Sequence, residues 1–302
     1  MVTAKLGLLV LLGLLWAMRL AAIKAAGLSG VPIHVVVSVA ATGIAAFFTL
    51  LAVARRDWPP IDRATGRFYL LSGTLGFLAP FALESAVAPQ LPVFVFVVVI
   101  ATMPLLTLVL SILVGAERPA LVPILAVAIG FAGAMAIVWD LGPEEQAGSA
   151  SGWWIAAGFG VPLLYAINTV FVATRWPAHA GPIDVAHAQA LIVAGAALLG
   201  SVATGTLGDW RLAGLNAPAL ALIVLGEGLA LLAYLRIARD FGATWVSFAN
   251  YVSMVFAAAI GALWFGDRLT PVTIAAAIVI AGAVVLYQWW GSTGRVPRVR
   301  RA

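Results

Sequence analysis

The chain has 302 residues, of which 63% are hydrophobic and only 10% are charged, and its formal net charge is +5. A soluble domain is typically about 45–50% apolar and about 25% charged, so this composition excludes a surface that faces water over most of the molecule. The lack of cysteine also excludes disulfides, thiolate nucleophiles and cysteine-ligated metals.

Long apolar segments, separated by proline, glycine or charged residues, predict ten transmembrane helices. Helices are expected because lipid offers no hydrogen-bond partner to backbone N–H and C=O groups. Each segment is close to the roughly 20 residues that cross a bilayer. The fold is therefore predicted to be an all-α integral membrane protein. The predicted spans are residues 6–26, 33–53, 68–88, 92–114, 120–140, 153–174, 185–206, 217–238, 243–265 and 271–290.

The distribution of lysine and arginine predicts the orientation. With the N-terminus in the cytoplasm, the outside holds only Lys24, Arg211 and Arg268, and Arg19 lies within a span. The other 13 of the 17 basic residues are then inside, as the positive-inside rule requires. Both termini are thus predicted to be cytoplasmic in a cell inner membrane. The dispersed charge argues against a nucleic-acid partner, and the basic residues 295–301 are expected to contact anionic lipid.

The two halves of the chain repeat each other at a nearly constant offset. Residues 14–19 match residues 163–168, 117–118 match 267–268, and 133–134 match 282–283, which gives displacements of 149 or 150 residues. Five helices is an odd number, so the second repeat enters the membrane from the opposite side. We therefore predict two inverted five-helix repeats, residues 1–145 and 146–302, an arrangement that suits alternating access.

Three ionisable residues fall well inside predicted spans: Arg19, Glu84 and Glu227. A charge at membrane depth costs between about 3 and about 15 kcal/mol, so such a residue is expected to face a wet cavity or a partner. The planar guanidinium of Arg19 suits a carboxylate or phosphate. The alternative for Arg19 is a structural ion pair with either glutamate.

Glu227 stands between Gly226 and Gly228, which would let backbone or substrate approach closely. It is expected to bind an ammonium group or to exchange a proton, and the alternative is a neutral or paired structural acid. Glu84 lies toward the outer end of the third span. It is the second candidate for proton coupling, and the alternative there is a solvated role near the interface.

Polar and aromatic residues in mid-span complete the predicted substrate site. Amides and phenols within a membrane either bridge helices or line a cavity. Asn168 is the repeat partner of Arg19, whereas the aromatic rings could equally be packing contacts. The remaining substrate-binding candidates are Trp16, Tyr165, Asn250 and Tyr251.

Three prolines, Pro80, Pro104 and Pro162, fall inside the third, fourth and sixth spans. Each removes a backbone hydrogen bond and is expected to bend its helix. The bends are candidates for gates and could equally be static kinks. None of the three histidines has a partner at metal-ligand spacing, so no metal or cofactor is expected.

Short motifs along nearly the whole chain resemble the drug/metabolite transporter superfamily, EamA type. These motifs are Leu15-Trp16-Ala17, Phe81-Ala82-Leu83, Met103-Pro104-Leu105, Gly115-Ala116-Glu117-Arg118, Phe265-Gly266-Asp267-Arg268-Leu269 and the small residues from Ile278 to Ala283.

The resemblance implies two five-helix bundles around a central cavity lined by helices 1, 3, 4, 6, 8 and 9. Two departures stand out. Arg19 occupies a position where a small or amide residue is more usual. Ser253-Met254 stands where the first half has Met103-Pro104, so a kink in the ninth helix to match the fourth is in doubt.

The residues and the resemblance together predict a secondary transporter that exports small metabolites, such as amino acids, by alternating access. Arg19 and Glu227 together would suit a zwitterion. A monomer or a homodimer is expected in the lipid bilayer. The alternatives are an uptake or drug-efflux permease of the same fold, or a membrane-embedded enzyme, although no catalytic motif for the latter occurs in the sequence.

Overall fold

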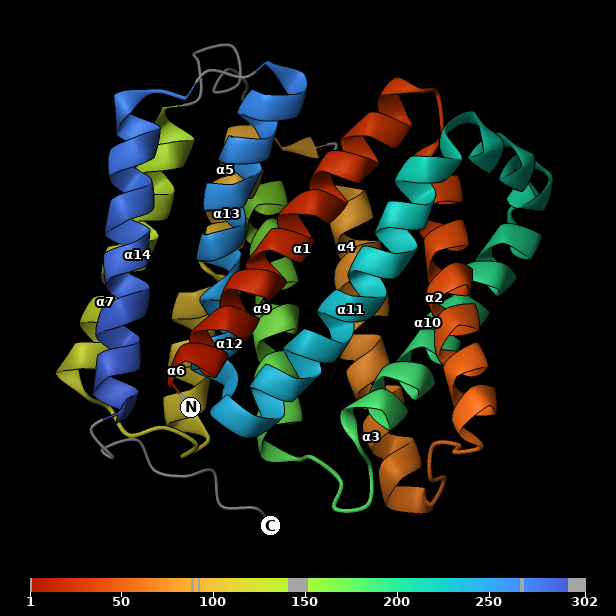
Figure 1. Ribbon diagram of the computed structural model, residues 1–302, viewed down its shortest axis with the longest axis horizontal. Coiled ribbons are helices and arrows are strands. Elements are labelled where there is room, and N and C mark those ends of the chain that lie inside the picture. Colours follow the sequence, from red (N-terminus) through yellow and green to blue (C-terminus); the bar gives the residue numbers. More distant parts are fainter. Residues whose placement is uncertain (1, 88–89, 92, 141–151, 267–268, 293–302) are drawn as a thin grey trace.

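The computed structural model describes residues 2–87, 90–91, 93–140, 152–266 and 269–292, and these form a bundle of helices (Figure 1). The described part contains no strand. Seven long helices are α1 (Val2–Leu28), α2 (Ile33–Arg55), α7 (Leu121–Trp139), α9 (Gly152–Thr174), α10 (Pro182–Ala203), α11 (Ala217–Phe241) and α14 (Pro271–Ser292). The segment η3 (Thr206–Asn216) is a 3-10 helix that precedes α11.

The remaining predicted spans are divided into shorter segments. The third consists of α3 (Arg63–Gly73), the π-helical η1 (Thr74–Leu78) and α4 (Ala79–Val87), and the fourth consists of α5 (Val93–Ala101) and α6 (Met103–Leu113). The ninth consists of α12 (Ala243–Ser247), α13 (Ala249–Ile260) and the π-helical η4 (Gly261–Phe265).

Eight helices in the described residues are long and apolar enough to cross a membrane, and a shorter apolar helix covers Val98–Leu113. The all-helical, multi-pass membrane architecture is therefore confirmed. The ten-span inverted repeat stays a prediction. The acidic residues 144 and 145, Arg268 and the basic segment 295–301 lie outside the described residues.

Proline explains the interruptions of the third and fourth spans. Pro80 has no N–H to donate to the carbonyl of Gly76, four residues earlier. The chain widens into the π turn η1 just before it, where the Ala79 N–H donates to the Thr74 carbonyl, five residues back. Pro104 similarly has no N–H to donate, and the helix breaks just before it, at Thr102. The Thr102 hydroxyl donates to the Val99 carbonyl at 2.6 Å. By contrast, α9 stays one helix through Pro162.

The ninth span breaks at Phe248 although it has no proline. Here a side chain competes with the backbone ladder. The amide of Asn250 donates to the Ser247 carbonyl at 3.1 Å, and the Ser247 hydroxyl donates to the Thr244 carbonyl at 2.8 Å. The fourth and ninth spans are thus both interrupted, although only the fourth has a proline near its break. The absence of this proline from the ninth span therefore did not keep that span continuous.

The helices pack in pairs that join the two halves of the chain. Helix α1 packs against α11 and α13, and α9 packs against α4 and α6. Helix α7 pairs with α14, and α2 pairs with α10. In Figure 1, α1 and α11 lie in front of α9 and α4, while the α7–α14 and α2–α10 pairs flank them.

Most described loops with basic residues lie at the end of the bundle where α1 begins, at the bottom of Figure 1. We call it the basic end, and its residues include Lys5, Arg56, Arg63, Arg118 and Arg175. Helix α3 starts with a capping box, in which the Asp62 carboxylate accepts from the N–H groups of Ala64 and Thr65. Which side of the membrane the basic end faces stays a prediction.

Candidate functional site

Arg19 of α1 and Glu227 of α11 form an ion pair, with 3.4 Å between Nε and Oε2. The Glu227 side chain is 17% exposed and that of Arg19 is 39% exposed. Close to this pair, the rings of Trp16 and Tyr234 join the same two helices, with 6.4 Å between their centroids. The pairing of Arg19 with a glutamate, one of the two interpretations drawn from the sequence, is therefore present in the structure.

Two further polar groups are close enough to interact electrostatically with the ion pair. They are Glu84 of α4 and the phenol of Tyr165 of α9. In Figure 1, α1 and α11, which carry Arg19 and Glu227, lie in front of α4 and α9, which carry Glu84 and Tyr165. Arg19, Glu84, Tyr165 and Glu227 are called the charge cluster below.

The glycines beside Glu227 differ in their surroundings. A Cβ atom at Gly228 would contact the Phe47 ring at 3.4 Å, so this position serves helix packing. Gly226 is also buried, yet a Cβ atom there would meet no atom within 4 Å. Of the two glycines, only Gly226 therefore leaves open space at its Cβ position.

Asn168 is fully enclosed by its neighbours. Its side chain is 2% exposed, and its amide donates to the Tyr234 hydroxyl at 3.2 Å. The Thr169 hydroxyl lies 3.1 Å from the same phenol oxygen. The π turn η1 brings Gly76 so close that a Cβ atom there would lie 2.4 Å from the Asn168 amide nitrogen. Asn168 thus joins α9, α11 and the third span, and a direct substrate contact stays a prediction.

Tyr234 was not among the predicted site residues. It lies seven residues after Glu227, two helical turns along α11, so both side chains share one face. This spacing was the available signal in the sequence. The Tyr234 phenol connects the aromatic pair with Trp16 to the hydrogen bonds of Asn168 and Thr169.

Asn250 and Tyr251 contact different helices. The Asn250 amide lies 3.1 Å from the Met103 sulfur, so it connects the interrupted fourth and ninth spans. Tyr251 is fully buried, and its hydroxyl donates to the Val127 carbonyl of α7 at 3.4 Å. Its ring packs on Gly130 of the same helix. Packing between α13 and α7 accounts for its position, and its predicted part in substrate binding is untested.

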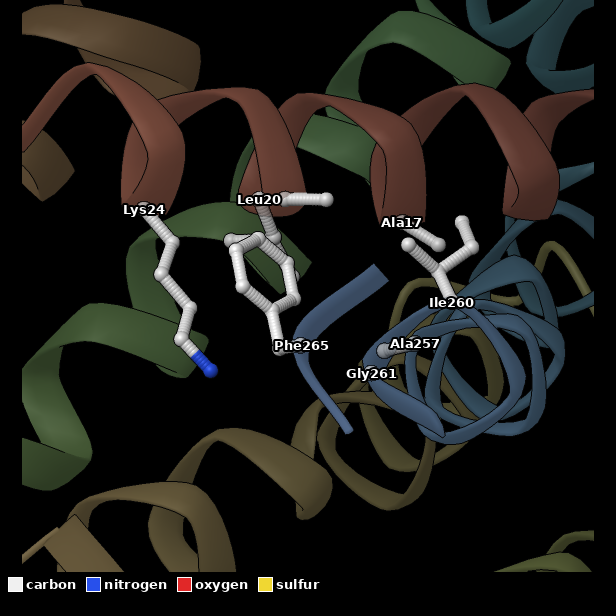
Figure 2. A pocket seen from close by; sticks show the side chains of 8 residues that line it. Ala17, Leu20, Lys24, Ala257, Ile260, Gly261 and Phe265 are labelled. Atoms are coloured by element: carbon white, nitrogen blue, oxygen red, sulfur yellow. The ribbon is translucent and has the colours of Figure 1, made fainter. Parts of the chain in front are cut away.

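A pocket of about 150 Å³ lies between α1 and the end of the ninth span (Figure 2). Lys24 and Phe265 extend along the same side of α1 in Figure 2, and the Lys24 ammonium lies 4.1 Å from the centre of the Phe265 ring. Small residues form much of the wall, among them Ala17, Ala257 and Gly261. None of the predicted substrate-binding residues lines this pocket. Among the described residues no group of His, Asp and Glu could hold a metal ion.

Comparison with known proteins confirms the resemblance that the motifs carry. Residues 4–139 match the family described as "EamA-like transporter family". No curated protein matches the chain. A solved structure titled "Crystal structure of protein" superposes with a TM-score of 0.77 at 15% identity, over 96% of this chain and 98% of the other. At this identity the likeness establishes the fold alone.

Proposed function

Because residues 4–139 place this chain in the EamA-like transporter family, we propose that it is a secondary transporter of small molecules that works by alternating access. The observation that carries the proposal is the charge cluster. Four helices, two from each predicted half, bring an arginine, two glutamates and a phenol within electrostatic reach of one another. Such groups are costly in a membrane protein, and a substrate path is the usual reason for keeping them.

The helix pairing supports alternating access. If the second half is an inverted copy of the first, α1 corresponds to α9, α2 to α10, the third span to α11, the fourth to the ninth, and α7 to α14. Exchanging the halves then turns the contact of α1 with α11 into that of α9 with α4, and the contact of α1 with α13 into that of α9 with α6. The α7–α14 and α2–α10 pairs map onto themselves. Two halves related in this way can exchange roles around a central site.

The substrate that best fits the charge cluster is a zwitterion of amino-acid type. A substrate carboxylate can take the place of Glu227 on the Arg19 guanidinium, and its ammonium can bind the glutamate that is released. The space beside Gly226 and the ring of Trp16 would accept a small or apolar side chain. Export across the inner membrane, with the basic end in the cytoplasm, is the direction we propose.

Proton coupling is assigned to Glu227, with Glu84 as the second candidate. A substrate carboxylate on Arg19 releases Glu227 from this ion pair, and the released carboxylate can then bind either the substrate ammonium or a proton. Substrate binding and proton binding would therefore be linked through the same ion pair.

The test is flux in proteoliposomes that contain the purified protein, with amino acids and cationic drugs as substrates. Glu227→Gln should abolish flux driven by a pH gradient. Asp209→Asn is the matched control, because it removes an exposed carboxylate of η3 that pairs with His34 and does not belong to the charge cluster. Unchanged pH-driven flux in Glu227→Gln would refute the coupling role.

The same assay distinguishes the substrate classes. Arg19→Gln should reduce transport of amino acids more than transport of amines that lack a carboxylate. If only cationic drugs are transported and Arg19→Gln leaves their flux intact, the chain is a drug-efflux permease and the zwitterion proposal is wrong.

A further inference from the structure

The loop between α6 and α7 places a carboxylate against the second half of the chain at the basic end. Gly115 has a left-handed backbone, with φ of 74°, and the N–H of Glu117 donates back to the Ser111 carbonyl at 3.0 Å. Tyr287 of α14, which is 6% exposed, donates its hydroxyl to Glu117 Oε2 at 3.1 Å. Thr244 of α12, which is fully buried, adjoins the same carboxyl group.

The segment that Glu117 contacts, α12, has a joint at each end. Gly242 precedes it with φ of 97°, a conformation that favours glycine, and the helix break at Phe248 follows it. All five residues of α12 are buried. Its Trp245 ring stacks on the Tyr287 ring, with 5.9 Å between the centroids. Helix α12 is thus a short segment with a joint at each end, packed against α6, α9 and α11 and capped by its contacts with Glu117 and Tyr287.

Helix α14, which carries Tyr287, is also fixed at its other end. At the opposite end of the α7–α14 pair, the Asp140 carboxylate accepts hydrogen bonds from Thr270 and from Thr273, the latter at 2.7 Å. The α7–α14 pair is therefore joined at both ends by a carboxylate, Asp140 at one and Glu117 at the other. Of the elements around Glu117, α12 is the one with joints that allow it to leave.

We propose that α12 closes the basic end of the transport path by docking on Glu117 and Tyr287, and that the Glu117 carboxyl binds a proton in this docked state. The proposal rests on the alternating-access function proposed above. It adds a proton-binding site that is separate from Glu227 and Glu84 and lies on a different loop.

The electrostatic surroundings set the direction of the linkage. Burial raises the pKa of Glu117, and the hydrogen bond from Tyr287 and the proximity of Thr244 only partly oppose this. Tyr287 is the titratable group that faces Glu117 from α14; α12 contributes no charged residue, and the adjoining Arg118 of the loop is exposed. Departure of α12 would expose Glu117 to water and lower its pKa. Acid therefore favours docking, and a rise in pH favours release.

One polar group of α12 is unfavourably placed in the docked state. The indole nitrogen of Trp245 is buried and has no hydrogen-bond partner in the part of the chain that the structure describes. A buried donor without a partner costs free energy that water would restore on release. The docked state is therefore one that α12 can leave.

The experiment uses the natural absence of cysteine from the chain. Ser247→Cys places one thiol on α12 at a position that is 1% exposed, and its reaction rate with a maleimide reports release of α12. The protein is held in nanodiscs so that both faces are accessible. Thr204→Cys, at an exposed position, supplies the reference rate, because the thiolate fraction itself rises with pH.

We expect the normalised rate to rise with pH. A change of about one pKa unit in Glu117 between the docked and released states changes the docking equilibrium about tenfold. Glu117→Gln, which mimics the protonated acid, should keep the rate low at every pH. Tyr287→Phe removes a hydrogen bond that lowers the pKa of Glu117, so it should move the rise to higher pH. Asp140→Asn should leave the profile in place.

A profile that Glu117→Gln does not flatten overturns the proposal. If that variant does not fold, an unshifted profile in Tyr287→Phe overturns it instead. The labelling needs no substrate, so a protein that shows no flux but keeps the expected profile would refute the proposed transport function and leave the docking of α12 standing.

Discussion

The ion pair between Arg19 and Glu227 predicts a strong coupling between two substitutions. At 3.4 Å, two unit charges attract by about 5 kcal/mol at an effective dielectric constant of 20 and by about 1 kcal/mol in water. Because 39% of the Arg19 side chain is exposed, solvent screening brings the expected coupling to about 1–3 kcal/mol. Arg19→Gln and Glu227→Gln should each destabilise the protein, since each leaves a charge without its partner.

The double variant Arg19→Gln/Glu227→Gln should be more stable than the sum of the two single changes predicts. Thermal unfolding of the four proteins in one detergent measures this, with a shift of about 2 °C for each kcal/mol in a chain of this size. The coupling should fall as salt is added, because the pair is partly exposed. Additive shifts that do not respond to salt would show that the two charges do not stabilise each other and would refute the reasoning from the observed distance.

Three further predictions concern single positions. Gly226→Ala should preserve folding, because its Cβ meets no atom within 4 Å, but should reduce substrate flux in liposomes if the substrate occupies that space; normal flux would show that the space is unused. Gly130→Ala should destabilise the protein by about 1–3 kcal/mol through overpacking, because its Cβ would lie 2.6 Å from the buried Tyr251 ring. Gly282→Ala should stabilise the protein slightly, because a Cβ atom there meets open space. Equal unfolding temperatures for the two variants would contradict this prediction. Asp62→Ala should lower stability near neutral pH, because backbone hydrogen bonds from Thr65 and Ala64 lower the pKa of Asp62 in the folded protein. The difference from the natural chain should disappear as the pH falls through that lowered pKa, and a difference that persists in strong acid would show that the cap does not depend on the charge.

The helices of this protein could be predicted from the hydrophobicity of each segment of the chain. A segment of about 20 apolar residues can be read without knowledge of its neighbours, because the bilayer imposes both its length and its backbone hydrogen bonding. The same reasoning singled out Arg19, Glu84 and Glu227, since any charge at that depth needs a partner or water. The structure places all three in one cluster, and the identity of the Arg19 partner was resolved only there.

Interruptions within helices were predictable only in part. Pro80 and Pro104 act locally, because a proline removes a hydrogen bond wherever it stands, and the π turn and the break at Thr102 accompany them. Pro162 shows that a proline can also be accommodated without a break. The break at Phe248 depends on the side chain of Asn250, which donates to a nearby carbonyl and also contacts Met103, 147 residues away.

The sequence by itself therefore determined the membrane environment, the helical class, the resemblance to the EamA-like transporter family and the short set of residues too costly to be incidental. The tertiary structure decided which of these residues meet, that Tyr251 packs against α7, that Tyr234 joins the site, and that the half-buried Glu117 accepts a hydrogen bond from Tyr287. The physical reason is range. Burial in lipid is a property of one segment, whereas contact between side chains depends on how several helices cross, which no single segment encodes.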